Sequence, residues 1–454
     1  MKHTYLGVLA FSAVFLYLIS VFYSPLWMET AYSGIAALLL FFSLFRMRTL
    51  NRIVVGLLLL IGSSLFLYYN TSFSNVLQSF GENLNLIGLF LLIPFLGILM
   101  SEAGYLQALQ AFFLEREKNR PSHPYRTGYL LTASMGSILN LGSMPLVYNI
   151  GYESFSTFEN KTFGLTLLRG FGFCMLWSPY FVNVGLILIL YDLSWSQIGG
   201  YGLLLAVLYT IIVWCFFRFT RFSREEWISN KQPVLQSRAA IKHSLHRLLA
   251  YIIILLLLSF LLELSLPINM LTSVSITALL YPLLWAGCTG LFQPYVQGGV
   301  QHVLSSFDRL YNEIGIFITA GFFGEALSLS QAGEWLSVVM MKGSHGIIPI
   351  LILLLIGTAM LLAFVGIHPV IIVLGLGSSL NPEQFGVHPP FMGLLLLTAW
   401  MIAVQISPFS GSVLMASNLM KVSPWKVIQK NAVFIGSLTI VMTIVLSIIH
   451  WLSL

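Results

Sequence analysis

Long apolar runs with few charges dominate this chain and restrict it to folds that span a membrane. Each of eleven runs is near the length of about 20 residues that crosses the hydrocarbon core of a bilayer. They cover approximately residues 5–22, 31–45, 53–69, 84–103, 162–190, 199–217, 248–266, 269–291, 312–329, 389–418 and 431–452. Only 8% of all residues are charged, whereas a soluble domain carries about 25%. The sequence therefore predicts an all-α polytopic membrane protein with about 11 transmembrane helices.

Two further apolar stretches, at 127–158 and 347–380, are interrupted at Gly142–Pro145 and Gly366–Pro369. Each arm is too short to cross the membrane alone. Backbone that leaves a helix at membrane depth is tolerated only inside protein or beside a watery cavity. We therefore expect two re-entrant hairpins, each returning to the side from which it entered.

The basic residues indicate the orientation of the chain, because Lys and Arg concentrate in cytoplasmic loops. With a cytoplasmic N-terminus and two returning hairpins, 21 of the 22 basic residues fall inside and Lys342 alone falls outside. The C-terminus then lies outside, and we expect the cell (plasma) membrane as the location. The net charge of +6 reflects this orientation, so no nucleic-acid partner is expected.

The second half of the chain repeats landmarks of the first half in inverted topology. Residues 85–101 match residues 312–328 at seven of seventeen positions, with an offset of 227. Two later pairs of landmarks follow in the same order: Gly142–Pro145 with Gly366–Pro369, and Ser178-Pro179 with Ser407-Pro408. Agreement in both order and spacing favours a true internal repeat.

The repeat divides the chain into five segments. Scaffold helices are expected in the first and fourth segments, the two repeats in the second and fifth, and a basic cytoplasmic linker in the third. The segments are 1–83; 84–217, with hairpin 127–158 and broken helix 162–190; 218–247; 248–311; and 312–454, with hairpin 347–380 and broken helix 389–418.

Proline marks each interruption of the helical pattern, at Pro145, Pro179, Pro369 and Pro408. The two Ser-Pro pairs have the form of a helix start, with a capping hydroxyl and proline at the first helical position. Ser143 and His368 would begin the returning arms of the hairpins in the same way. Half-helix N-termini that meet near the midplane suit an anionic group, as in transporters with inverted repeats. The alternative is a simple proline kink in each helix.

Polar groups near the breaks are the candidate substrate ligands. They are Asn140, Gly142, Ser143, Ser178, Asn183, Gly366, His368, Gln405, Ser407 and Ser410. Each Ser, Asn or Gln has the alternative role of bridging neighbouring helices, and His368 has that of a structural histidine bonded to a carbonyl.

Glu325 and His368 are the candidate coupling residues, because an ionisable group at membrane depth is costly unless it binds a cation or carries a proton. The alternative for Glu325 is a position near the outer interface. Arg169 is expected to extend to lipid phosphate rather than bind substrate. The three cysteines have no partners at ligand spacing, so neither a metal site nor a disulfide framework is expected.

Two inverted units, each with a hairpin followed by a helix broken at Ser-Pro, resemble the ion transporter superfamily, which includes divalent anion:sodium symporters and the large subunits of tripartite carboxylate transporters. The resemblance covers about 84–217 and 312–452. Sodium-coupled dicarboxylate members carry Ser-Asn-Thr at each hairpin tip, where this chain has Asn140-Leu-Gly-Ser143 and Val365-Gly-Ile-His368. The resemblance implies elevator-like alternating access and a homodimer.

The sequence therefore predicts a secondary active transporter, not an enzyme, for a small polar, anionic, carboxylate-type solute. Coupling to H+ or Na+ is expected, and no other cofactor. The chain has no Gly-x4-Gly-Lys-Ser/Thr motif, which disfavours ATP-driven transport. One alternative is a cation/proton antiporter centred on Glu325. An alternative of another class is a membrane-embedded lipid- or glycan-handling protein, a flippase or polymerase, for which no His-x4-Asp or Asp-Asp pair is present.

Overall fold

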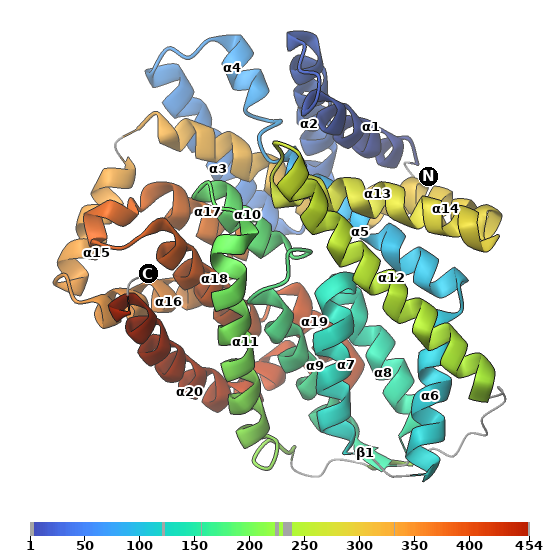
Figure 1. The fold of residues 1–454 in the computed structure, drawn as a ribbon. Helices are drawn as coiled ribbons and strands as arrows, with labels where there is room; N and C mark the ends of the chain where they lie inside the picture. Colours follow the sequence, from blue (N-terminus) through green and yellow to red (C-terminus); the bar gives the residue numbers. More distant parts are fainter. Residues whose placement is uncertain are drawn as a thin grey trace.

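The structure of this chain, a computed structural model, describes residues 4–119, 123–155, 157–222, 227–229, 238–330 and 332–452. Almost all of this part of the chain is helical, and its one sheet is the antiparallel pair of β1 (Thr157–Glu159) and β2 (Trp227–Ser229). Figure 1 shows helices running in many directions around a helical core. The expectation of an all-α membrane protein is confirmed.

The helices of the first half begin with four that precede the expected repeat. These are α1 (Thr4–Ser20), α2 (Leu26–Arg46), α3 (Thr49–Tyr68) and α4 (Phe73–Gln78). The others are α5 (Leu84–Glu102), α6 (Tyr105–Asn119), α7 (Pro124–Leu139), the 3-10 turn η1 (Asn140–Gly142), α8 (Ser143–Ser154), α9 (Asn160–Met175), α10 (Val182–Leu190) and α11 (Trp195–Phe216).

The second half contains α12 (Arg238–Ser265), α13 (Met270–Thr289), α14 (Phe292–Ser328), α15 (Ala332–Ser344), α16 (Ile348–Phe364), α17 (Pro369–Ser379), the turn η2 (Pro382–Phe385), α18 (Pro389–Ile406), α19 (Gly411–Met420) and α20 (Pro424–Trp451). From α15 to α20 the order of longer and shorter helices resembles that from α6 to α11. Helices α4, α6 and α15 were not expected from the sequence.

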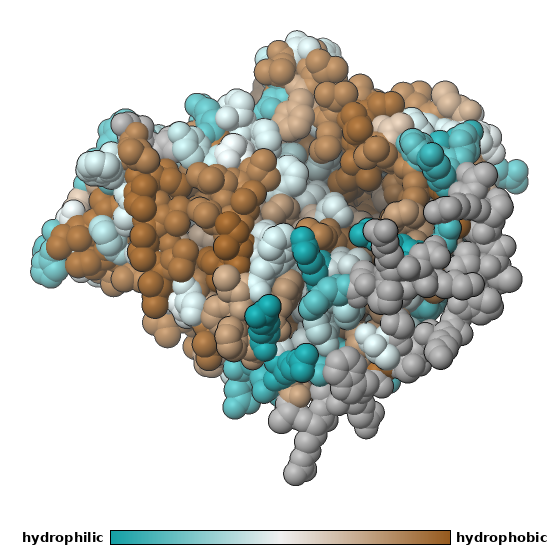
Figure 2. Space-filling model, turned by 60° about the horizontal axis from the view of Figure 1, so that its bottom comes forward, coloured by the Kyte–Doolittle hydropathy of each residue, from teal (hydrophilic) through white to brown (hydrophobic). Residues whose placement is uncertain are grey.

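Nine helical segments of the described chain are long and apolar enough to cross a membrane. They are α2, α3, α5, the continuous segment from α7 to α8, α11, residues 240–265 of α12, α13, the segment from α18 to α19, and α20. Large apolar side chains are exposed on several of them, among them Leu67, Leu261 and Val433. Figure 2 shows broad hydrophobic areas on one face of the molecule. Such exposure suits contact with lipid rather than water.

One helix is longer than the sequence suggested. The apolar run at 312–329 forms only the second half of α14, which begins at Phe292 and has 37 residues. Hydropathy misplaced this start because the first half of α14 carries Gln, His, Asp and Arg, which lower hydropathy without breaking a helix. The expected boundary between residues 311 and 312 therefore lies inside one continuous helix.

Two sets of helices pack mainly among themselves. In the first set, α14 contacts α1, α2, α3, α5 and α13, and α5 also contacts α1 and α13. In the second set, α7 packs on α9, α16 packs on α18, and both pairs contact the helices that follow. The two sets meet where α5 touches α7 and α10, and where α14 touches α17. We refer to them below as the α14 set and the α9–α18 set.

The helix interruptions fall at the positions marked in the sequence. The chain leaves the helix between α9 and α10, between α18 and α19, at η1, and between α16 and α17. The detail at the Ser-Pro pairs differs from expectation, however. Pro179 and Pro408 lie three residues before α10 and α19, which start at Val182 and Gly411. The serine of each pair bonds to a neighbouring helix, Ser178 to α7 and Ser407 to α16. These bonds hold the Ser-Pro pairs outside α10 and α19, the helices that they were expected to start.

Glycine allows α11 to pack closely against the break that follows α9. A Cβ atom at Gly202 would lie 2.3 Å from the carbonyl oxygen of Leu176, whereas a Cβ at Gly200 has nothing within 4 Å. We therefore expect Gly202→Ala to destabilise the protein by about 1–3 kcal/mol, because α11 must move away from the break. Gly200→Ala should be neutral or stabilise by up to about 1 kcal/mol through helix propensity. The unfolding temperature of both variants is measured in detergent. Equal changes for Gly202→Ala and Gly200→Ala would contradict the close packing at Gly202.

Candidate functional site

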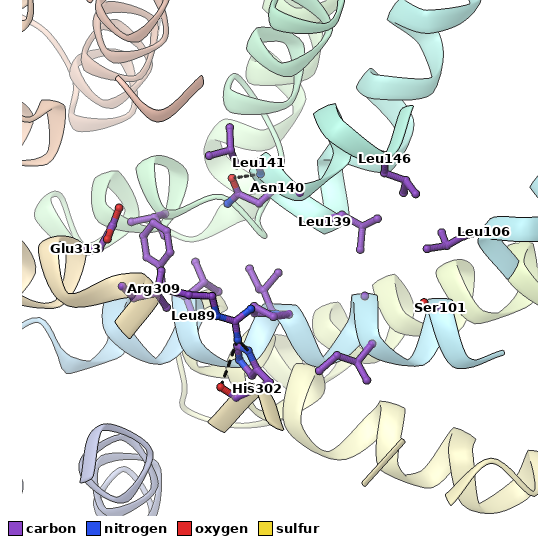
Figure 3. A pocket seen from close by; sticks show the side chains of 18 residues that line it. Leu89, Ser101, Leu106, Leu139, Asn140, Leu141, Leu146, His302, Arg309 and Glu313 are labelled. Atoms are coloured by element: carbon purple, nitrogen blue, oxygen red, sulfur yellow. Dashed lines mark hydrogen bonds between the residues drawn. The ribbon is translucent and has the colours of Figure 1, made fainter. Parts of the chain in front are cut away.

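A cavity of about 580 Å³ lies where the α14 set meets the α9–α18 set. In Figure 3 the turn η1 lies on one side of the cavity, and α5 and α14 lie on the other. Its polar lining residues are Ser101, Asn140, His302, Arg309 and Glu313, and the rest of the wall is glycine or apolar. This size is typical of small-molecule sites.

Three polar side chains reach the cavity from one face of α14. His302, Arg309 and Glu313 are spaced by seven and four residues, a spacing that places them on the same side of a helix. The guanidinium of Arg309 donates to Nδ1 of His302 at 2.8 Å and to the hydroxyl of Ser305 at 2.8 Å. In the described chain Arg309 has no carboxylate within ion-pair distance. Its charge therefore has only neutral partners.

His302 links α14 to α5 and orients Arg309. Its Nε2 lies 2.9 Å from the carbonyl oxygen of Leu91, which can only accept a hydrogen bond. The proton therefore resides on Nε2, and Nδ1 is left to accept from Arg309. His302 is 6% exposed, so this neutral ring acts as a fixed support for the guanidinium (Figure 3).

Two helix N-termini reach the same cavity from the opposite side. Gly142, which precedes α8, and Val182, the first residue of α10, both line it. Neither helix has a side-chain hydrogen bond at its N-cap. Uncapped N–H groups carry partial positive charge and bind anions readily. The N–H of Ser143 at the start of α8 bonds to the backbone carbonyls of Asn140 and Leu141, and Pro145 in its first turn has no N–H. The cavity therefore combines one guanidinium with the open N-terminus of α10.

Asn140 shapes the turn that closes this side of the cavity. Its φ of 52° lies in the left-handed region, which Asn tolerates better than most residues. Its side chain accepts a hydrogen bond from the N–H of Leu141 at 2.8 Å, and its carbonyl accepts one from the hydroxyl of Ser143 at 2.8 Å. Asn140 and Gly142 are the two predicted site residues that line the cavity.

The predicted residues of the second half lie elsewhere. His368 and Ser410 cap α17 and α19, accepting hydrogen bonds from Val370 and Val413. Gly366 has a φ of 100° and lies close to the side chains of Leu50 and Phe409. None of these three predicted residues lines the cavity. Side chains cap the N-termini of α17 and α19, whereas α10 in the first half begins without a side-chain cap.

The two serines of the Ser-Pro pairs make equivalent contacts. Ser178 donates to the carbonyl oxygen of Ser137 on α7 at 2.5 Å, and Ser407 donates to that of Ala363 on α16 at 2.6 Å. Each hydroxyl also accepts from the backbone N–H two residues later, at 3.3 Å. These bonds join the break after α9 to α7, and the break after α18 to α16. Both serines therefore bridge neighbouring helices, which was the alternative to a role in substrate binding.

Asn183 and Gln405 are likewise engaged with protein groups. Asn183 donates to the carbonyl oxygen of Met175 at 2.7 Å, across the break between α9 and α10. Gln405 is fully buried and exchanges hydrogen bonds with the hydroxyl of Tyr209. Both amides thus support the framework behind the cavity.

Two charged residues singled out in the sequence lie outside the cavity. Glu325 is exposed near the end of α14, and its role in coupling stays a prediction; the carboxylate among the residues that line the cavity is Glu313. Arg169 was expected to reach lipid phosphate, but it is 2% exposed. It donates to Asn431 at 3.1 Å and Thr220 at 3.0 Å, and its guanidinium lies 4.2 Å from the ring of Phe434. Polar partners from α20 and from the segment after α11 hold it inside.

The residues that sequence reasoning missed are His302, Arg309 and Glu313. Their helical spacing is visible in the sequence, but the expected helix began at residue 312, after His302 and Arg309, and Arg309 was counted only as a cytoplasmic charge. In the part of the chain that the structure describes, no three His, Cys, Asp or Glu side chains are grouped to hold a metal ion.

No family model and no curated protein matches this chain. Functional inference therefore depends on the cavity itself.

The twin serine contacts generate a stability prediction. Ser178→Ala and Ser407→Ala should each destabilise the protein by about 1 kcal/mol, because each leaves a buried carbonyl without its added donor. Ser134→Ala is the matched control, since that exposed hydroxyl bonds only to its own helix. The unfolding temperature in detergent is measured for the three variants. A decrease for Ser134→Ala as large as for Ser178→Ala and Ser407→Ala would contradict the bridging role.

Proposed function

We propose that this protein is a secondary active transporter that moves a small anionic solute across the plasma membrane by elevator-like alternating access. The observation that carries the proposal is the cavity between η1 and the helices α5 and α14, with Arg309 on one wall and the uncapped N-terminus of α10 on the other. A binding site between two packed sets of helices suits a mechanism in which one set moves against the other.

The proposed architecture consists of two inverted repeats with eleven spans and two re-entrant hairpins, as in the ion transporter superfamily. Interactions that correspond between the halves support it. The α19 helix packs on α8 and α9, and α10 packs on α17 and α18, which is the pattern expected when two similar units cross over each other. The equivalent bonds of Ser178 and Ser407 add support at the level of single residues.

In this mechanism the α14 set forms the scaffold and carries Arg309 and Glu313, and the α9–α18 set moves against it and carries the opposite wall of the site at η1. The arm helices α6 and α15 connect the two sets in each half. We propose a cytoplasmic N-terminus and an outer C-terminus, and coupling to H+ or Na+. Glu313 is the carboxylate best placed for coupling, because it lines the cavity one helical turn after Arg309.

The proposal predicts that the tip at Gly142 becomes accessible from both sides of the membrane. Gly142 is exposed and has room for a side chain. In a background with Cys215 and Cys288, both exposed, replaced by serine, Gly142→Cys should react with a membrane-impermeant maleimide in both right-side-out and inside-out vesicles. Ser74→Cys, on the short exposed helix α4, should react from one side only. Reaction of Gly142→Cys from a single side would refute alternating access at this site.

A further inference from the structure

We infer that the cavity selects an amphipathic monoanion, a ligand with one carboxylate-like or phosphate-like head and an apolar body. This inference rests on the proposed transport function and specifies the class of solute. It differs from the dicarboxylate class, because the cavity provides for one negative charge and for no second one.

The wall of the cavity is predominantly apolar. Eleven of its eighteen lining residues are aliphatic, aromatic or proline, and they come from both sides of the site. Leu89 on α5 lies across the cavity from Leu139 and Leu146 beside η1 (Figure 3). Ile93 on α5 and Leu310 on α14 also line it. A ligand that buries apolar surface against these side chains gains about 25 cal/mol per Å². A uniformly polar solute would lose its hydration over most of this wall without replacement.

The charged groups limit the ligand to one negative charge. Arg309 is the single cation among the lining residues, and Glu313 is the single acid. The uncapped end of α10 supplies further N–H donors on the opposite wall. One anionic head can be shared between these donors and Arg309. A second anionic group would lie against leucine side chains or beside Glu313, where burial and like charge both oppose it.

The support of Arg309 by neutral groups completes the argument. His302 and Ser305 accept hydrogen bonds from the guanidinium and thereby fix its position, but they contribute no negative charge. An arriving anion therefore does not displace an existing ion pair. A carboxylate and a phosphate would be bound by the same groups, so the ligand is either a water-soluble organic acid or the head group of an anionic lipid.

The test uses the purified full-length protein in a neutral detergent after removal of bound lipid. Thermal unfolding is recorded with octanoate, with octanedioate, which has the same length and two charges, and with octan-1-ol, which has none. Octanoate should stabilise the protein at concentrations at least tenfold below those that octanedioate or octanol requires. Equal stabilisation by octanedioate, or by octanol, would overturn the inference.

Variants of Arg309 distinguish binding of octanoate in the cavity from a nonspecific effect of octanoate on stability. Arg309→Gln should weaken octanoate binding by about ten- to hundredfold, since a charge-assisted hydrogen-bonding partner is lost, and Arg309→Lys should retain part of it. Arg218→Gln removes the same charge from an exposed position after α11 and should leave binding unchanged. If Arg309→Gln does not fold, Leu146→Asp provides a second test, because a carboxylate in the apolar wall should abolish octanoate stabilisation.

Addition of phosphatidylglycerol, an anionic lipid, distinguishes a lipid ligand from a water-soluble organic acid. If this lipid stabilises the protein through Arg309 and competes with octanoate, the natural ligand class includes anionic lipids; if octanoate acts alone, it is a soluble acid. Octanedioate stabilisation that equals that of octanoate and depends on Arg309, or no effect of any probe, would overturn this inference only. The proposed transport function would then still stand or fall on the accessibility of Gly142→Cys.

Discussion

The requirement that backbone polar groups be satisfied at membrane depth determines much of this structure. Lipid offers no hydrogen bonds, so every place where a helix is interrupted must find partners inside the protein. Ser178 and Ser407 bond each broken helix to the helix pair before it, and Asn183 spans the gap between α9 and α10. These contacts make the interruptions stable features of the fold.

The same requirement also distinguishes the cavity from the other breaks. His368 and Ser410 close the N-termini of α17 and α19, whereas α8 and α10 begin without a side-chain cap. The N–H of Ser143 at the start of α8 bonds to the backbone carbonyls of Asn140 and Leu141, whereas α10 begins beside the cavity without a side-chain cap. The first half therefore contributes one open helix end to the cavity, and α14 of the second half contributes His302, Arg309 and Glu313.

Two arginines of this protein, Arg169 and Arg309, show how surroundings determine the role of a charge. Arg169 is buried and joins α9 to α20 through Asn431, and to the segment after α11 through Thr220. Its Nε and Nη1 donors are bonded to protein groups and its flat face lies on Phe434, as expected of a structural guanidinium. Arg309 is held by His302 and Ser305 but lines an open cavity. The first stabilises the contact between the halves, and the second is available to a ligand.

The sequence by itself determined the membrane class, most helix positions and the places where helices break. These properties are local, since they depend on hydropathy over about 20 residues and on the chemistry of proline, serine and glycine at single positions. The burial of Arg169, the length of α14 and the meeting of its polar face with η1 were decided only by the tertiary structure. They depend on which helix faces pack together, and in an apolar chain almost every face is hydrophobic enough to be buried. The pattern of residues therefore located the elements of the site, but the packing of α5, α14 and the first tip selected Asn140, His302, Arg309 and Glu313 from among them.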